Sequence, residues 1–135
     1  VFNCKYASFF TIAEDSLGSR KLILRRTSFR KLKPLENVGC YDLGQDWKGR
    51  HCKHSLTGWV ASNQTALRIH NFPREDSPES VIQEFRAALD AYDPLLIWGN
   101  YLEDSKEQAS FLAVPILDPS QPSRTLGVIR FSQKD

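Results

Sequence analysis

Two apolar segments near the end of the chain have the length and spacing of a β-hairpin. Ser110–Leu117 and Thr125–Phe131 are rich in branched and aromatic side chains, and residues 118–123 between them contain two prolines and two serines. Apolar segments of strand length that are joined by turn-forming residues commonly pair as antiparallel strands. The pattern therefore predicts a hairpin in this part of the chain.

A second hairpin is predicted nearer the start. Residues 5–13 are rich in β-branched and aromatic side chains and stop at a polar turn over residues 14–18, after which residues 21–27 begin a new apolar run. In residues 28–54 the hydrophobic residues show no regular spacing typical of a helix or strand, because Pro34 and several glycines interrupt the segment. We expect a long, partly irregular segment there, and such segments often carry function.

A short helix followed by a strand is predicted in the middle of the chain. Ser55 or Thr57 can cap a helix through Gly58–Ser62. In residues 66–72, Leu67, Ile69 and (less cleanly) Asn71 alternate with Arg68, His70 and Phe72, as the two faces of a strand do. Pro73 ends this predicted strand.

A longer helix is predicted after this strand. Residues 76–79 form its start, with a side-chain oxygen as the cap and a proline in the first turn, and Pro94 closes it. Residues 95–98 and 101–102 are apolar without a clear period. Helical spacing predicts an inward face made of Val81, Ile82, Phe85, Ala88, Leu89 and Tyr92.

The order of these elements predicts an α+β fold, in which helices pack on an antiparallel sheet. At 135 residues, with 41% hydrophobic and 25% charged residues, the chain fits one globular domain spanning residues 1–135. No apolar run approaches the ~20 residues of a membrane helix, and the first residues lack the features of a signal peptide. The sequence contains no methionine, so we expect a domain excised from a longer protein.

Charge is distributed unevenly along the chain. Residues 1–54 carry eleven Lys and Arg against five acids, whereas residues 55–135 carry seven against eleven. A basic cluster can bind phosphate or nucleic acid by releasing counterions, but no aromatic residue interleaves within residues 20–28 as a stacking platform would require. We expect a solvated strand face and a charged loop rather than a nucleic-acid site. Much of the excess comes from Arg20, Lys21, Arg25, Arg26, Arg30, Lys31 and Lys33.

The cysteines do not suggest a disulfide framework. Three cysteines at irregular spacing fit a reducing cytoplasm better than a secreted scaffold. His51, Cys52 and His54, with Cys40 upstream, have the right ligand types for zinc or haem but lack the spaced pairs of a structural zinc site. We therefore predict solvated loop residues there and no metal.

Two motifs resemble those of GAF domains, the sensory modules of phosphodiesterases, cyclases and many bacterial signalling proteins. The first is Ser55–Gln64 followed by Leu67–Phe72, which is similar to the family's glycine-led short helix ahead of a strand. The second is Ser110–Ile116 with Leu126–Ile129, which resembles the family's Val-Pro and Ile-Gly-Val strands. The two motifs lie in the family's order, downstream of a β-hairpin. The resemblance implies a GAF-like (profilin-like) fold whose usual flanking helices are truncated in this chain.

Elementary physics predicts the same arrangement. Gly58 lets the short helix approach the sheet closely, and Gly127 marks a point in a strand where a neighbour comes near. Pro115 cannot donate to a central ladder, so we expect a bulge or an outward-facing amide there.

The resemblance also allows three activities found in the family to be tested against the residues of this chain. Covalent bilin attachment is not expected, because no cysteine follows Cys52, and the cyclic-nucleotide signature of the family is missing because no Asn precedes a Lys. Reductase chemistry on free methionine sulfoxide is not expected, since Thr57 and residues 73–109 supply no cysteine. We find no hydrolase elbow, P-loop or zinc-protease motif, so we expect no catalytic residues in this domain.

A ligand pocket is expected between the sheet and the segments 38–54 and 73–109. Such pockets are mostly apolar with a few polar anchors, and aromatic residues of this kind more often fill the core than line a pocket. Trp59 is expected to pack rather than bind. The candidate pocket residues are Tyr41, Trp47, His70, Phe72, Phe85, Trp98, Tyr101 and Phe111.

Three functional hypotheses follow. The first is a cytoplasmic GAF-type sensor of a bacterial signal-transduction protein, such as a two-component system. It would bind a small molecule or relay a conformational signal to a kinase, cyclase, phosphatase or transcription module, with a homodimer in the full-length protein. The second is a degenerate domain that acts only in dimerisation or protein interaction. The third is a redox or haem sensor that uses Cys40, Cys52 or His70.

Overall fold

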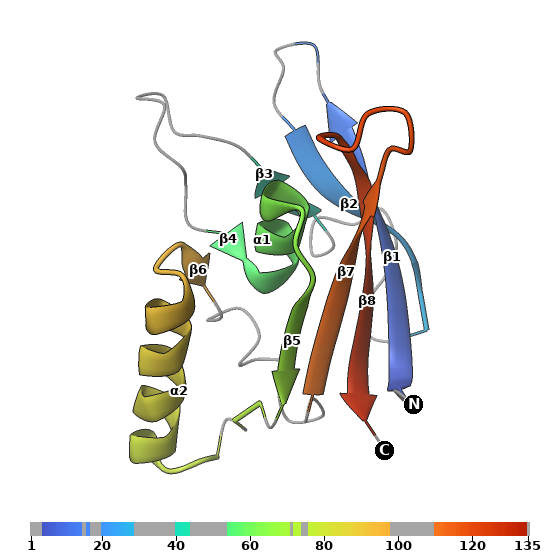
Figure 1. Ribbon diagram of the computed structural model, residues 1–135. Coiled ribbons are helices and arrows are strands. Elements are labelled where there is room, and N and C mark those ends of the chain that lie inside the picture. The colour runs from blue at the N-terminus through green and yellow to red at the C-terminus, as the bar shows by residue number, and fades with distance from the viewer. Residues whose placement is uncertain are drawn as a thin grey trace.

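The fold places two helices on one side of a single large β-sheet (Figure 1). The computed structural model describes residues 4–14, 16, 20–28, 40–43, 54–70, 72–73, 76–97 and 110–134. The predicted strands and helices occur in the predicted order, with three further short strands among them, and the α+β class is confirmed.

The sheet has six strands in the order β3-β2-β1-β8-β7-β5, and all neighbouring strands are antiparallel. Both predicted hairpins are present, and their inner strands β1 and β8 pair at the centre of the sheet. The strands are β1 Cys4–Glu14, β2 Arg20–Thr27, β3 Cys40–Leu43, β5 Leu67–His70, β7 Ser110–Leu117 and β8 Thr125–Lys134.

Three short strands lie where no strand was predicted. β3 extends the sheet beside β2, within the segment predicted to be largely irregular. The strands β4 (His54–Ser55) and β6 (Leu96–Ile97) form a separate parallel pair. This pair joins the start of the short helix to the chain that follows the longer helix.

The short helix α1 (Leu56–Asn63) lies against the inner face of the sheet and is nearly all buried. Six consecutive residues, from Leu56 to Ala61, are buried, including Gly58. The core that α1 covers includes the fully buried residues Phe10, Leu22, Leu24, Phe111 and Val128.

The longer helix α2 (Glu79–Tyr92) is buried along a narrower stripe than predicted. Ile82 and Leu89 are buried and Phe85 is half-buried. The remaining predicted inward residues, Val81, Ala88 and Tyr92, are exposed. Residues 82, 85 and 89 are three or four positions apart and share one face of the helix. Residues 81, 88 and 92 lie on the neighbouring face. The helix therefore contacts the core along one line only.

The predicted side-chain cap of α2 is wrong. Pro78 occupies the N-cap position with extended backbone angles, and no side chain caps the helix there. The carbonyl oxygen of Pro78 accepts hydrogen bonds from the amides of Val81 and Ile82 at 2.9 and 3.2 Å. Helix α2 ends at Tyr92, two residues before Pro94, as predicted.

In the β7–β8 hairpin, Gly127 and Pro115 each occupy a position that suits their residue type. A Cβ atom at Gly127 would collide with the backbone carbonyl oxygen of Phe10 on β1, so only glycine fits. Pro115 lies two residues beyond Ala113, the last β7 residue that pairs with β5. Among the residues that the structure describes, no strand pairs with β7 on that side at Pro115, so the missing amide hydrogen removes no bond to β5. The register shift falls one residue later, between Ile116 and Leu117.

Candidate functional site

Three of the predicted pocket residues contribute to one aromatic region on the inner side of the sheet. Phe72 follows β5, Phe85 projects from α2, and Phe111 lies on β7. The rings of Phe72 and Phe85 are tilted against each other with centroids 5.1 Å apart. Phe72 and Phe111 belong to the buried core, and Phe85 packs against it. These three candidates therefore lie together on the inner side of the sheet, as part of the core or packed against it.

His70 does not join this region. The strand β5 alternates buried and exposed residues, and Leu67 and Ile69 are buried while Arg68 and His70 are exposed. Because successive side chains of a strand point to opposite faces, His70 lies on the side away from Phe111, which pairs with Ile69. The expectation that His70 lines the inner pocket is wrong.

The remaining pocket candidates are not placed by the structure. Tyr41 lies on β3, opposite Leu22, but its side chain is outside the description. Trp47, Trp98 and Tyr101 lie outside the described residues altogether.

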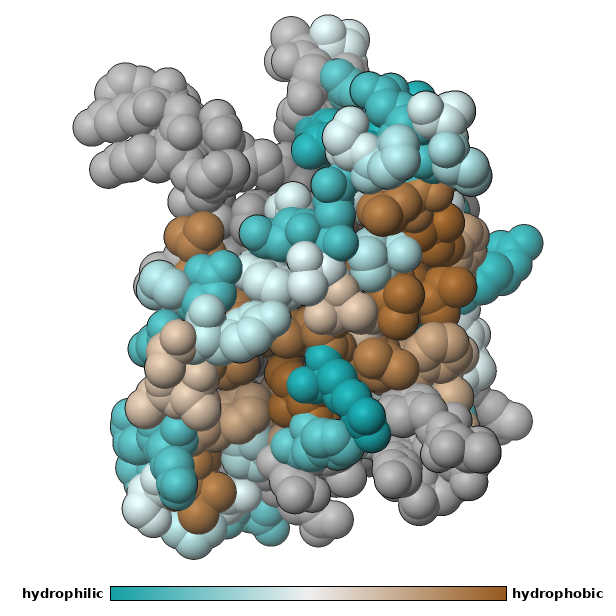
Figure 2. Space-filling view, viewed as in Figure 1, coloured by the Kyte–Doolittle hydropathy of each residue, from teal (hydrophilic) through white to brown (hydrophobic). Residues whose placement is uncertain are grey.

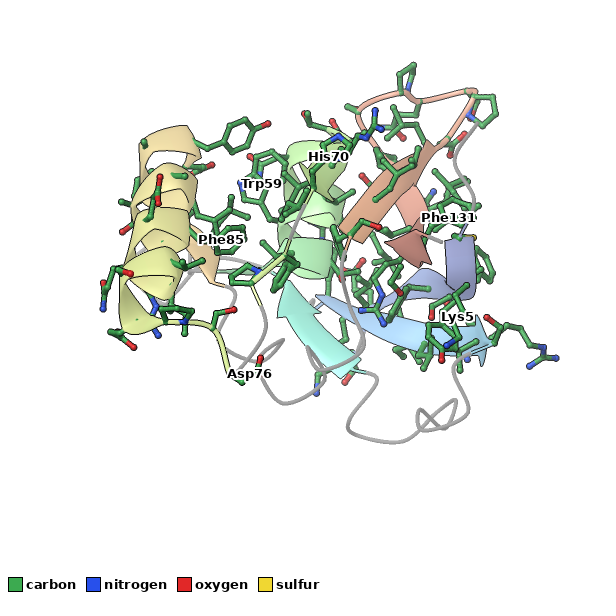
Figure 3. All side chains as sticks on the ribbon, turned by 90° about the horizontal axis from the view of Figure 1, so that it is seen from below. Lys5, Trp59, His70, Asp76, Phe85 and Phe131 are labelled. Atoms are coloured by element: carbon green, nitrogen blue, oxygen red, sulfur yellow. The ribbon has the colours of Figure 1, made fainter. Side chains whose placement is uncertain are left out.

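Trp59 links the two helices and packs rather than facing solvent. It is 5% exposed, and its indole Nε1 donates a hydrogen bond of 2.7 Å to Oδ2 of Asp93, directly after α2. Its ring lies 5.6 Å from that of Tyr92. Figure 3 shows Trp59 and Phe85 in the region between α1 and α2. The middle of α1 is thus joined to the end of α2 through side chains, and Trp59 packs as predicted.

A set of buried polar side chains lies on the inner face of the sheet and beside it, and the sequence did not indicate it. Arg130 of β8 is 4% exposed, and its Nη1 donates to Oγ1 of Thr57 on α1 at 3.3 Å. The hydroxyl groups of Ser8 and Thr27 share a hydrogen bond of 2.8 Å. The hydroxyl of Thr125 donates to the carbonyl oxygen of Ala61. The buried polar residues are Ser8, Thr57, Ser110, Thr125, Arg130 and Ser132.

Within the described ranges, no three His, Cys, Asp or Glu side chains gather as a metal site would require. His51 and Cys52 lie outside those ranges, and only the backbone is described at Cys40 and His54. Of the residues in the redox and haem hypothesis, the side chains of Cys40 and Cys52 lie outside the description, and His70 is exposed.

The basic residues of the second strand lie mainly in solvent. Arg20, Lys21 and Arg26 are exposed, and Nε of the partly buried Arg25 donates to Oγ1 of Thr11 at 2.7 Å. Residues 29–39, which contain Arg30, Lys31 and Lys33, are outside the description.

Neither α1 nor α2 is long and apolar enough to cross a membrane, and these are the helices in the part of the chain that the structure describes.

Comparison with known proteins identifies a structural relative but no family. No family model matches the chain, and no curated protein matches it. The fold is similar to the solved structure of a hypothetical protein from S. aureus, with a TM-score of 0.54 and 19% sequence identity. The similarity covers 98% of this chain and 82% of that one. At this identity the likeness concerns the fold alone.

Proposed function

We propose that the chain is a GAF-type sensory domain, which binds a small molecule on the inner side of the sheet and passes a conformational signal to an attached module. The residues that carry the resemblance lie in ordered elements: the Gly58 motif forms α1 and leads into β5, and the Val-Pro and Leu-Gly-Val motifs form the β7–β8 hairpin. This arrangement supports the proposal. It does not identify the ligand.

The observation that carries the proposal is the unequal attachment of the two helices. Six of the eight residues of α1 are buried, whereas α2 buries only Ile82 and Leu89 among its fourteen residues. Elements with few buried contacts open locally at lower free energy than the core does. The helix α2 is thus the element that a ligand against the Phe72 and Phe85 rings could displace.

Signalling requires that the ligand distinguish two positions of α2. A ligand shifts a conformational equilibrium only by its difference in affinity for the two states. The Trp59–Asp93 hydrogen bond joins α1 to the end of α2, so a displacement of α2 would also change the environment of α1. In the whole protein the output would be a kinase, cyclase, phosphatase or transcription module in the cytoplasm, and the domain itself would not be catalytic.

A ligand screen tests this proposal directly. Thermal-shift measurements against a metabolite library, followed by native mass spectrometry, should yield at least one compound that raises the melting temperature and binds stoichiometrically. Phe85→Ala should reduce that shift, whereas Val81→Ala, on the exposed side of the same helix, should preserve it. Failure of every compound to bind would overturn the small-molecule proposal.

A second candidate function is self-association through the outer face of the sheet. On this face, residues that pair across β1, β8 and β7 form three rows, and none of the nine residues in these rows is charged. The rows are Ala7, Phe131 and Leu112; Phe9, Ile129 and Val114; and Thr11, Gly127 and Ile116. Phe9 and Val114 are 37% and 38% exposed. Figure 2 shows hydrophobic residues gathered along β7 and β8.

Arginines flank this patch: Arg26 is opposite Phe9, Arg68 is opposite Leu112, and Arg25 donates to Thr11. Exposed apolar patches with a polar rim commonly mark interaction surfaces. Sedimentation velocity over a range of concentrations should show a dimer that Val114→Glu dissociates. Gln83→Glu on the exposed face of α2 is the matched control. A protein that stays monomeric at the highest concentration would exclude this second function.

A further inference from the structure

A bulge in strand β2 places two arginines on the same face of the sheet. Phe9 of β1 pairs with Arg26, and Phe10 pairs with Leu24, so Arg25 is an additional residue between the two pairs. Bulges redirect side chains and are common beside functional sites. Here the bulge brings together two cationic side chains that regular alternation along the strand would place on opposite faces.

The residues on either side of the two arginines both face inward. Leu24 is fully buried in the core. The hydroxyl of Thr27 shares a hydrogen bond with that of Ser8, which is buried on the inner face. The two arginines between Leu24 and Thr27 therefore share the outer face.

Hydrogen bonds position each guanidinium on this outer face. Nε of the partly buried Arg25 donates to Oγ1 of Thr11 at 2.7 Å. Nη1 of the exposed Arg26 donates to the backbone carbonyl oxygen of Arg25 at 3.0 Å, so the second guanidinium lies against the backbone of the first arginine. Phe9, which is opposite Arg26, borders the pair and is 37% exposed. Both cationic groups are thus held at the edge of the uncharged rows.

The arginine pair has no counter-charge among the residues that the structure describes. Neither Arg25 nor Arg26 forms an ion pair with any of them, and the pair between Arg124 and Asp118 lies in the hairpin loop. The three rows of the outer face beside the arginines contain no acid. Positive charges on adjacent residues repel each other, and an anion bound to both would remove that repulsion.

The remaining N–H groups of the pair suit a phosphoryl group. The bond to Thr11 leaves both Nη groups of Arg25, and the bond to the backbone leaves Nε and Nη2 of Arg26. Each set presents two N–H groups in one plane, which matches two oxygens of a carboxylate or phosphate. A phosphomonoester has three acceptor oxygens and a charge of about −1.5 to −2 near neutral pH, so it can neutralise both guanidiniums. A carboxylate carries one charge and neutralises only one of them.

We propose that Arg25 and Arg26 form a binding site for a phosphomonoester group on the outer face of the sheet. Thr11 orients Arg25, and Phe9 offers an apolar contact to the molecule that carries the phosphate. The inference goes beyond the sensory function, because this site lies on the face opposite the aromatic region. A soluble phosphorylated metabolite and a lipid with a terminal phosphate share this chemistry, and the experiments below distinguish them.

Titration with sodium phosphate, followed by nuclear magnetic resonance of the arginine Nε–H signals, tests the soluble ligand. At constant ionic strength, set with sodium chloride, the signals of Arg25 and Arg26 should shift until they saturate. The signal of Arg68, an exposed arginine on the same face, should not shift. Sodium acetate should bind more weakly than phosphate because it carries one charge. Equal binding of acetate and phosphate would overturn the phosphoryl assignment.

Matched variants separate a defined site from general attraction by positive charge. Arg26→Gln should weaken phosphate binding by about tenfold or more, since it removes hydrogen bonds between charged groups. Arg68→Gln removes the same charge from the same face and should change the affinity by less than about twofold. Thr11→Val keeps every charge but removes the acceptor that positions Arg25, so binding should weaken here too. Equal losses with Arg26→Gln and Arg68→Gln would show diffuse attraction and overturn the site.

A vesicle assay identifies the source of the phosphate. The protein is sedimented with phosphatidylcholine vesicles that contain or lack phosphatidic acid. Sedimentation that requires phosphatidic acid, and that Arg25→Gln but not Arg68→Gln abolishes, identifies a lipid headgroup. Binding of soluble phosphate without sedimentation identifies a soluble ligand. If the protein binds neither, the proposal is overturned, while the ligand screen for the inner side of the sheet is unaffected.

Discussion

The indole nitrogen of Trp59 and a carboxylate oxygen of Asp93 are 2.7 Å apart, and the bond between them joins α1 to the end of α2. The other carboxylate oxygen of Asp93 accepts a hydrogen bond from the amide of Leu95 at 2.9 Å. One side chain therefore both fixes the turn after α2 and attaches that turn to the buried helix. This connection holds the C-terminal end of α2 to the rest of the fold.

Removing the Trp59 donor should weaken this attachment. Trp59→Phe keeps an aromatic ring but removes the hydrogen bond to a charged group, so we expect a loss of about 1–2 kcal/mol in the free energy of unfolding. Denaturant unfolding followed by far-UV circular dichroism measures it. Asp90→Asn, at an exposed position on α2, should change stability by less than about 0.5 kcal/mol. Equal effects of the two substitutions would show that the bond contributes nothing.

Gly127→Ala should be strongly destabilising. The added Cβ would meet the carbonyl oxygen of Phe10, a backbone atom in the adjacent central strand that cannot move alone. We expect a loss of about 3 kcal/mol or more, at the upper end of overpacking effects. Ser123→Ala, at an exposed loop position of the same hairpin, is the control and should leave the midpoint of thermal unfolding nearly unchanged. A stable Gly127→Ala protein would mean that β1 and β8 lie further apart than described.

Both hairpins could be predicted because their strands are neighbours in the sequence. Each pair of apolar segments is separated by turn-forming residues, so pattern and loop composition agree on the same local structure. The strand β3 could not be predicted in this way. Its four residues are too few to show a period, and it forms because β2 offers an open edge for hydrogen bonding.

The position of Arg130 could not be read from the sequence for a different reason. It stands between Ile129 and Phe131, so simple alternation would place the two apolar residues in the core and the arginine in solvent. The structure reverses this, with Val128, Arg130 and Ser132 buried. Both faces of β8 are largely apolar, and a shift of one residue in the pairing register would exchange the side chains that face the core with those that face away from it. Only the pairing with β1 and β7 determines the face.

The hairpin loop should have a measurable pH response at Asp118. The Ser120 hydroxyl donates to the carboxylate at 2.7 Å and, together with the Ser120 amide and Arg124, lowers the pKa of Asp118 below its ordinary value of 3.8. The ionised form is thus favoured in the folded state. Its stabilising effect is complete above the ordinary pKa and is lost as the pH falls through the lowered pKa.

Titration of the Asp118 carboxyl carbon by nuclear magnetic resonance tests this order of causes. Ser120→Ala should raise the pKa of Asp118 towards 3.8, and Arg124→Gln should raise it less, because the hydroxyl hydrogen bond is the larger cause. Asp118→Asn should destabilise the protein at neutral pH and have little effect in strong acid. If Arg124→Gln raised the pKa of Asp118 more than Ser120→Ala did, Arg124 and not the Ser120 hydroxyl would be the main cause of the lowered pKa.

The narrow buried stripe of α2 predicts that this helix opens before the rest of the fold. Phe85 is half-buried against Phe72, so Phe85→Ala should cost about 2 kcal/mol, less than the about 3–5 kcal/mol typical of a fully buried phenylalanine. Hydrogen exchange should accelerate in the amides of α2 and remain slow in α1, because α1 keeps its own buried contacts. Val81→Ala, which removes a side chain that is 43% exposed, should leave both helices unchanged. If Phe85→Ala accelerates exchange equally in α1 and α2, the two helices open together, and α2 alone cannot be the element that a ligand displaces.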